Sequence, residues 1–474
     1  MVEENFIDTG YYKEPAYLTP KEVYNKKYEK LNSNIPVDLL LEPSDYSSSN
    51  GSIVHFPKID DLEFNNIYWQ SQKIRSSGVI YLYSAHYDNR ELVDNSIRII
   101  SFAKTEIISS VKYCQLFFQD KKMVEIISIS SAIPINFKEW DTHMFLLTCK
   151  MPPKLLTQIP AAVSVVESQY DTATNVLKVH YNPLEAGKEK QDFAICTKPL
   201  LYPQQDLSFY LVQYIELAKL LGIGKIFFHK YYLHPNMSAV MRYYEKQDQV
   251  DLTPFTNPGI SNNLPLVMQT LWQIPRKTKL KEKDKRMSTQ MERASQTDCF
   301  YRNMYKYKYI TNFDLDEIMI PSNGKTLKEV IDSVISKTKK ERGGLYTPPV
   351  GYMIPMGIFS ESFQSSWTPG IPKYMSMLQN VNRTGYLRHY KGFMDTERLL
   401  GVSTHRPERC IGECIVQNLE ESEAFLAHYR DLNPQGLGKD ASELIYKVTD
   451  TRIWNYKDEM IKNVDKALKA IGLL

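Results

Sequence analysis

The alternation of strands and helices that begins after Gln191 constrains the fold of this chain more than any other sequence feature. Short runs of β-branched and aromatic residues alternate there with runs whose apolar residues recur at helical spacing. The order is strand, helix, strand, helix, strand, over residues 193–196, 206–221, 225–229, 238–245 and a short segment near Val250. Gly222 supplies a stop for the first helix. This order is typical of a mostly parallel sheet with right-handed crossovers, and it predicts an α/β fold.

A strand that ends in two carboxylates follows later in the chain. Residues 307–313 are rich in β-branched and aromatic side chains, and Asp314 and Asp316 come directly after them. Ligands bind outside the carboxyl ends of strands in α/β sheets, and side chains two residues apart on an extended segment point to the same side. Two such carboxylates can hold a divalent cation, which can bind a diphosphate. The alternative is a solvated acidic turn, but the apolar runs on both sides favour a site.

The rest of the chain divides into regions of different composition. The chain has 474 residues, which is more than usually fold around one hydrophobic core, so we expect two or three domains. Residues 1–74 are polar and predict an irregular stem. Residues 75–188 hold short β-rich runs separated by turn residues, which predict an all-β, sandwich-like domain. These runs are residues 79–84, 96–102, 115–118, 124–130, 144–149, 163–166 and 176–181. Residues 189–474 form the predicted α/β domain. Helices are also expected over residues 290–305 and 327–339.

The net charge indicates which class of binding partner to expect, and the cysteines indicate the cellular compartment. The net charge is only +3, so the composition does not call for nucleic acid, and the basic run over residues 276–286 is interpreted as a solvated loop. The six cysteines lack paired C-x-x-C metal spacing and allow fifteen disulfide pairings. Together with the N-x-S/T sequons at Asn50, Asn236 and Asn382, the even cysteine count favours a secretory lumen.

The sequence carries no membrane address of its own. No stretch approaches the roughly 18 consecutive apolar residues of a spanning helix, and residues 1–10 are not a signal peptide. We therefore expect either a fragment that lacks its anchor or a cytosolic chain.

Five motifs together resemble glycosyltransferase family 92, in which they occur in the same order. They are Phe193-Ala-Ile-Cys-Thr-Lys-Pro-Leu200, Tyr214–Leu217 with Leu221–Ile223, Gln296–Cys299 with Arg302, Asp314–Pro321, and Ala427-His-Tyr-Arg430. The upstream segment Tyr81–Arg90 is similar to the β-domain that precedes the catalytic domain in animal members. The resemblance covers roughly residues 75–465, and it is specific as a set although each motif alone is weak.

The resemblance implies a catalytic domain of GT-A type, with a Rossmann-like, mostly parallel sheet, preceded by the all-β domain. Such an enzyme transfers galactose from UDP-galactose, with inversion, to a glycan acceptor on a glycoprotein, glycolipid or polysaccharide. Family members typically form β1,4 linkages, here expected to a galactose or fucose residue, and are typically type II membrane proteins of the Golgi lumen. A homodimer is a further expectation. The chain departs from this pattern because it lacks the anchor.

The family pattern also implies a metal site. Asp314 and Asp316 are expected to bind Mn²⁺, or else Mg²⁺, which would act as a Lewis acid on the donor diphosphate. GT-A enzymes often complete the metal shell with a downstream histidine, and the motif match assigns that role to His428, with His405 as its rival. An isolated histidine is more often structural than a ligand, so this assignment depends on the resemblance. Glu317 is expected to support the loop.

The general base is expected between the metal aspartates and the late histidine. Glu361 lies in that interval, and Asp395 and Glu397 compete with it. A base must come within about 3 Å of the acceptor hydroxyl, a condition that sequence does not test.

Donor contacts are expected at the ends of the first two strands of the α/β domain. Thr197 and Lys198 follow the first strand, and His229 and Tyr231 lie at the end of the second. Asp298 and Arg302 precede the strand that ends at the two aspartates. They are expected either to contact the donor sugar or to stabilise the loop, and the stabilising role is favoured slightly.

Trp367 is the candidate acceptor contact, because sugar rings stack on aromatic faces, but a partly buried core tryptophan is an equal alternative. Two rival functions remain. A catalytically inactive glycan-binding protein on the same scaffold would not need Asp314 and Asp316. A phosphoryl-transfer enzyme would ordinarily carry a G-x-x-x-x-G-K-S/T loop, which the chain lacks.

Overall fold

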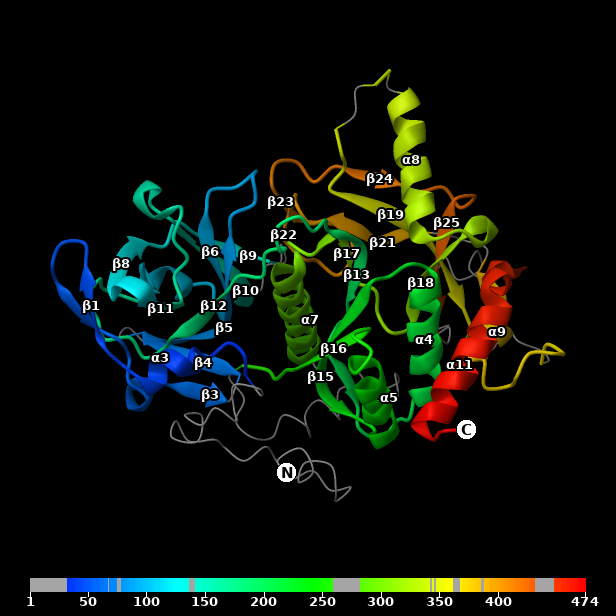
Figure 1. Ribbon diagram of the computed structural model, residues 1–474, viewed down its shortest axis with the longest axis horizontal. Helices are drawn as coiled ribbons and strands as arrows, with labels where there is room; N and C mark the ends of the chain where they lie inside the picture. Colours follow the sequence, from blue (N-terminus) through cyan, green and yellow to red (C-terminus); the bar gives the residue numbers. More distant parts are fainter. Residues whose placement is uncertain are drawn as a thin grey trace. The chain divides into compact units, whose positions relative to one another are not determined.

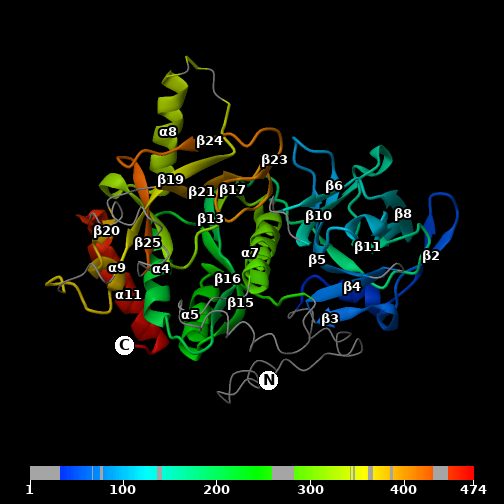
Figure 2. The same ribbon diagram turned by 180° about the vertical axis from the view of Figure 1, so that it is seen from behind.

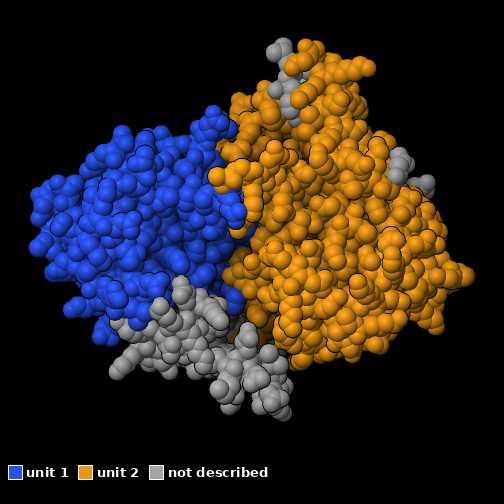
Figure 3. All heavy atoms as spheres, viewed as in Figure 1, with its two compact units in different colours: residues 1–185, 254–305, 401–403 blue, residues 186–253, 306–400, 404–474 orange. Residues whose placement is uncertain are grey.

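A computed structural model describes residues 32–474 except 67, 75–77, 136–140, 259–281, 342, 345–346, 361–366, 385–387 and 431–446. The chain forms two compact units, which Figure 3 shows in different colours. Unit 1 comprises residues 1–185, 254–305 and 401–403, and unit 2 comprises residues 186–253, 306–400 and 404–474. Among the described residues, no helix combines the length and the apolar character needed to cross a membrane.

Unit 1 is built on one twelve-stranded sheet (Figure 1). Its strands are β1 (Asp45–Ser48), β2 (Ile53–His55), β3 (Phe64–Asn66), β4 (Trp69–Ile74), β5 (Gly78–Asp88), β6 (Ser96–Lys104), β7 (Tyr113–Phe118), β8 (Met123–Ser128), β9 (Ser131–Pro134), β10 (Thr142–Lys150), β11 (Ala162–Val166) and β12 (Leu177–His180). Their order is β2-β1-β8-β7-β11-β12-β5-β6-β10-β9, with β4 also paired to β5 and β3 to β4. The β1–β8 and β12–β5 pairs are parallel, so the sheet is mixed.

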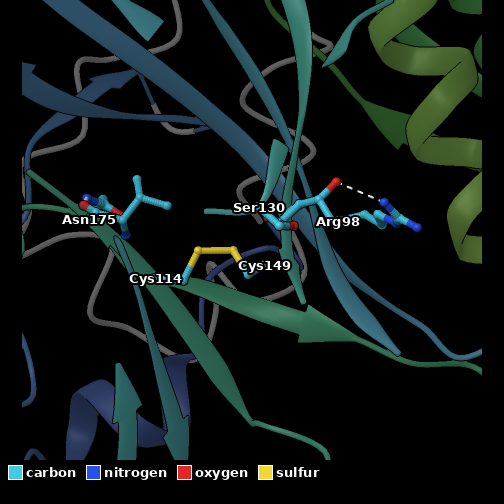
Figure 4. Close-up of a disulfide and its surroundings, with 7 residues drawn as sticks. Arg98, Cys114, Ser130, Cys149 and Asn175 are labelled. Atoms are coloured by element: carbon cyan, nitrogen blue, oxygen red, sulfur yellow. Dashed lines mark hydrogen bonds between the residues drawn. A yellow bond between two sulfur atoms is a disulfide. The ribbon is translucent and has the colours of Figure 1, made fainter. Parts of the chain in front are cut away.

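The sheet of unit 1 curves back on itself. Strands β7 and β10 are separated in the sheet order by four other strands. Nevertheless, Cys114 on β7 and Cys149 on β10 form a disulfide, with their Cα atoms 6.3 Å apart (Figure 4). The two strands therefore face each other, and their apolar side chains share one buried core. All of the β-rich runs predicted between residues 79 and 181 are confirmed as strands.

Residues 32–66 are more ordered than their composition indicates. Residues 32–66 hold a short helix, α3 (Val37–Leu41), and strands β1 to β3, where irregular structure is predicted. Ile35, Tyr46 and Phe56 join Phe117 of β7 in a second buried core. These apolar residues are too scattered along the sequence to produce a periodic pattern, and they are buried by packing against residues that are distant in sequence. The domain boundaries at residues 74 and 188 stay a prediction.

Unit 2 is built on a second twelve-stranded mixed sheet. Its strands are β13 (Gln191–Cys196), β14 (Leu200–Tyr202), β15 (Lys225–Leu233), β16 (Val250–Pro254), β17 (Tyr307–Thr311), β18 (Glu317–Pro321), β19 (Gly351–Phe359), β20 (Asn382–Thr384), β21 (Arg388–Asp395), β24 (Val416–Asn418), β25 (Ala424–Tyr429) and β26 (Lys447–Thr449). The main path is β14-β15-β13-β17-β21-β19-β20-β26. The sheet is parallel from β14 to β17, and antiparallel pairing begins at β21. It is thus less uniformly parallel than predicted, but compatible with an α/β fold.

The predicted helices are present. Unit 2 contains α4 (Ser208–Leu220), α5 (Pro235–Glu245), α8 (Leu327–Glu341), α9 (Ser376–Gln379) and α11 (Lys457–Ile471), and unit 1 contains α7 (Glu282–Asn303). Helices α4 and α11 lie side by side, as seen from both sides in Figures 1 and 2. Both contribute to one core with the sheet. Helix α4 ends where Gly222 adopts a φ of +89°, which a side chain would disfavour.

Candidate functional site

Lys198 and Asp314 meet at one edge of the unit 2 sheet. Strands β13 and β17 are parallel neighbours, with Ile195 opposite Thr311. Because parallel strands end at the same edge, the residues that follow them leave the sheet together. The Nζ atom of Lys198 lies 3.0 Å from Oδ2 of Asp314. Sequence reasoning predicted each residue at a strand end, and the sheet brings the two into an ion pair.

Lys391 reaches the same carboxylate from an antiparallel strand. On β21 it lies two residues before Phe393, which pairs with Thr311 of β17. Its Nζ lies 3.1 Å from Oδ2 of Asp314 and 2.7 Å from Oε2 of Glu317. The ammonium also donates to the backbone carbonyl of Asn312, at 3.2 Å. Sequence reasoning missed Lys391, because a single lysine in a short strand carries no motif signal.

Glu317 closes the acidic turn as expected of a supporting residue. The backbone N–H of Asp314 donates to Oε2 of Glu317 at 3.1 Å. In return, the N–H of Glu317 donates to the carbonyl of Asp314 at 3.0 Å. These reciprocal bonds hold the turn between β17 and β18 in one conformation.

His428, rather than His405, lies against the second aspartate. Strands β18 and β25 are antiparallel, with Glu317 opposite His428. Nε2 of His428 lies 3.2 Å from Oδ2 of Asp316, while Nδ1 lies 3.7 Å from Oε1 of Glu317, too far for a hydrogen bond. His405 lies in an exposed bend, next to Thr404, whose carbonyl accepts from the side chain of Asn312.

Carboxylate groups outnumber ammonium groups in the site. Burial alone would raise the pKa of Asp314, but the positive charges of Lys198 and Lys391 outweigh burial and hold this pKa well below its usual range. Burial also acts to raise the pKa of Asp316, and the hydrogen bond with His428 lowers it overall. Both carboxylates are therefore ionised at neutral pH. Together with Glu317 they make three carboxylates, one more than the two ammonium groups of Lys198 and Lys391.

Several buried polar atoms of unit 2 have no hydrogen-bond partner among the described residues. They are the hydroxyls of Thr197, Tyr210, Tyr214 and Tyr429, and Oδ1 of Asp314. Burial, followed by the charge of Asp316, raises the pKa of Tyr210, so its hydroxyl keeps its proton and remains a donor. Unsatisfied buried groups are uncommon in native proteins, and a bound polar ligand is one way to satisfy them.

The side chains of the site supply only some of the ligands that a metal ion requires. Within the described ranges, no three Asp, Glu, His or Cys side chains converge as a ready-made metal site. Asp316 and His428 form a pair, and Asp316 is 39% exposed. Carboxylates suit Mg²⁺ and Mn²⁺, and imidazole suits transition metals. The pair therefore fits Mn²⁺ better than Mg²⁺, provided that a diphosphate and water supply the other ligands.

The expected donor contacts from the first two strands lie at the same end of the sheet. Cys196 of β13 pairs with Phe227 of β15, so Thr197 and His229 both lie beyond this pair toward the carboxyl end. Both side chains are buried, while Tyr231 is partly buried. Their contact with a donor stays a prediction.

The candidates for the base and the acceptor contact are placed differently. Glu361 lies outside the described residues. Asp395 pairs with Tyr309 of β17, and Glu397 follows it, so both lie away from the edge that carries Asp314. Trp367 is 56% exposed. The Nζ atom of Lys373 lies 5.9 Å from the centroid of its ring. The acceptor role of Trp367 stays a prediction.

Asp298 and Arg302 belong to unit 1 and take part in a buried network there. Nε of Arg302 lies 2.7 Å from Oδ2 of Asp298, and Nε2 of His86 lies 3.2 Å from Oδ1. These contacts tie helix α7 to strand β5. A contact of either residue with the donor stays a prediction.

Comparison with known protein families bears on the identity of this chain. No curated protein sequence matches the chain. The sequence model of glycosyltransferase family 92 matches residues 191–469, which contain the acidic turn, Lys198, Lys391 and His428. This match covers more than half of the 474 residues. The chain therefore belongs to glycosyltransferase family 92.

Proposed function

We propose that this glycosyltransferase transfers galactose from UDP-galactose to a glycan acceptor, with inversion of the anomeric configuration. We also propose that Asp316 and His428 bind a divalent cation, which in turn binds the donor diphosphate. The observation that carries the metal proposal is the 3.2 Å approach of His428 to Asp316 beside the acidic turn. The choice of UDP-galactose, and of a β1,4 linkage to galactose or fucose, follows from the family resemblance.

The residues around this pair have separate roles. When bound, Mn²⁺ would supply Lewis-acid stabilisation of charge on the leaving diphosphate. Asp316 and His428 would hold the ion, and the reciprocal bonds between Asp314 and Glu317 would keep the turn in place for it. Asp314 is a poor base because its pKa is held low by two lysines. Glu361 remains the proposed base.

The acceptor and the compartment are also proposals. Trp367 exposes a large aromatic face on which a sugar ring could stack. The disulfides Cys114–Cys149 and Cys410–Cys414 support a secretory compartment, and we propose the Golgi lumen with a type II membrane anchor.

A donor and acceptor screen tests this function. UDP release would be measured with UDP-galactose and other UDP-sugars, on galactose- and fucose-terminated acceptors, with Mn²⁺ or with a chelator. We expect Mn²⁺-dependent release from UDP-galactose, abolished by Asp316→Asn and unaffected by Asp332→Asn, which alters an exposed carboxylate on α8. Full activity of Asp316→Asn in the presence of chelator would overturn the metal role.

The rival function is a glycan-binding protein without activity. Calorimetry separates the two, because an inactive lectin has no use for a diphosphate-binding cation. Binding of UDP that strengthens when Mn²⁺ is added supports the enzyme, and glycan binding without any UDP binding supports the lectin.

A further inference from the structure

The two aspartates of the acidic turn face different chemical groups. Asp316 lies against the imidazole of His428. Oδ2 of Asp314, by contrast, accepts from the ammonium groups of both Lys198 and Lys391. A carboxylate oxygen already shared by two cations is a poor ligand for a third. The two aspartates therefore differ in their partners: Oδ2 of Asp314 is occupied by two ammonium groups, and Oδ2 of Asp316 faces an imidazole.

The two lysines are not equivalent either. The side chain of Lys391 is 1% exposed and contacts Asp314, Glu317 and the carbonyl of Asn312. The side chain of Lys198 is 20% exposed and extends from the segment that follows β13. Lys391 is a fixed internal counter-ion, whereas Lys198 can exchange its partner.

We propose that Lys198 leaves Asp314 when the donor binds and takes up the diphosphate, while Lys391 remains paired with Asp314. This inference rests on the proposed function, and it makes Lys198 the leaving-group cation and Asp314 its resting partner instead of a metal ligand. After the exchange each residue still has an oppositely charged partner, because Asp314 keeps Lys391, which it shares with Glu317, and Lys198 gains an anion.

The surroundings of Lys198 support an anionic ligand. The hydroxyl of the adjacent Thr197 is buried without a partner among the described residues. The hydroxyls of Tyr210 and Tyr214 are also buried without a partner there, and burial, together with the charges of the acidic turn, raises the pKa of both tyrosines. Burial raises the pKa of Tyr202 to about 12 and the charge of Lys198 opposes this effect, so the ammonium lies within electrostatic range of that ring. Protonated hydroxyls and an ammonium are donors that suit phosphate oxygens.

The proposed role has a defined place in the transfer step. The bond between C1 of the sugar and the diphosphate oxygen breaks, and that oxygen keeps the electron pair. The acceptor oxygen forms a bond to C1 and gives its proton to the base. Lys198 donates an N–H to the diphosphate as its charge increases, which lowers the barrier without a change in its own protonation.

Binding of inorganic pyrophosphate tests the inference without donor sugar or acceptor. Calorimetry of the full chain in chelator would compare wild type with Lys198→Met, Lys198→Arg and the control Lys328→Met, which alters an exposed lysine of α8. We expect Lys198→Met to weaken pyrophosphate binding by about 10- to 100-fold, as for a lost charge-assisted hydrogen bond. Lys198→Arg should recover part of the affinity, and Lys328→Met should bind like wild type.

Equal pyrophosphate affinity in wild type and Lys198→Met, or no binding to either, would overturn the inference. Manganese binding, followed by electron paramagnetic resonance in the presence of UDP, supplies a second readout. Asp314→Asn should retain the bound Mn²⁺ signal that Asp316→Asn loses, and loss of the signal in both variants would return Asp314 to the metal shell. Failure of the proposed function would give a different result. UDP-galactose would then not be turned over, although pyrophosphate binding would still depend on Lys198.

Discussion

Nζ of Lys391 lies 2.7 Å from Oε2 of Glu317, and both side chains are almost completely buried. The pair joins strand β21 to the first residue of β18, across 74 residues of sequence. Through the same ammonium, it is connected to Asp314 and to the carbonyl of Asn312. The acidic turn is thereby held by one internal cation.

Replacing Lys391 by methionine should destabilise unit 2. The change leaves Asp314 and Glu317 buried without this cation, and breaking a buried ion pair costs about 3–5 kcal/mol. Urea unfolding at neutral pH would measure the loss. Lys328→Met is the matched control, because its exposed pair with Asp332 should contribute only about 0.3–0.5 kcal/mol. Equal stability of the two variants would show that Lys391 is not the internal counter-ion.

Replacing His428 by alanine should weaken metal binding. Loss of a residue that hydrogen-bonds to a metal ligand lowers metal affinity by about 10- to 100-fold. Loss of a ligand itself should lower the affinity at least as much. Titration with Mn²⁺ in the presence of UDP, followed by electron paramagnetic resonance, would measure the change. His405→Ala is the control, and a larger loss in that variant would transfer the ligand role to His405.

The stability of unit 1 should fall as the pH falls below about 6.5, the ordinary histidine value. Burial lowers the pKa of His86 and of His180, although Asp298 opposes the effect at both. Because the pKa of each histidine is lower in the folded protein, the unfolded chain binds the proton at a higher pH than the folded chain does. The stabilising contribution of the neutral histidines is therefore complete above the pKa of the unfolded chain. It is lost as the pH falls through that value toward the pKa of the folded protein.

Denaturant unfolding followed between pH 8 and pH 5 would test this dependence, because most carboxylates titrate below this window, at about pH 4. His86→Gln should flatten the dependence, whereas His55→Gln, on an exposed side chain, should leave it unchanged. A pH dependence that is identical in all three proteins would contradict the assignment.

The disulfides Cys114–Cys149 and Cys410–Cys414 should differ in their contribution to stability. Cys114–Cys149 closes a separation of 35 residues, and Cys410–Cys414 closes a separation of 4. Because a cross-link restricts the unfolded chain more when its loop is longer, Cys114→Ala/Cys149→Ala should cost about 3–4 kcal/mol. Cys410→Ala/Cys414→Ala should cost less. Thermal unfolding would compare the two double variants, and a reversed order would contradict the loop-length argument.

The local elements could be predicted because their signals are local. The helix that ends at Gly222 and the strand that ends before Asp314 depend on the spacing of neighbouring residues and on a nearby stop signal. The order seen in residues 32–66 could not be predicted in this way. Ile35 and Phe56 are buried in a core to which Phe117, Val124 and Val176 contribute from distant parts of the sequence.

The sequence by itself determined the succession of strands and helices, the acidic turn, the family and the motif that contains His428. Only the tertiary structure decided that Lys198 and Lys391 share one oxygen of Asp314 and that His428 instead of His405 lies against Asp316. These contacts join residues that are between 77 and 116 positions apart. They depend on which strands are neighbours and on their register, and neither quantity is encoded in the spacing of residues along one segment.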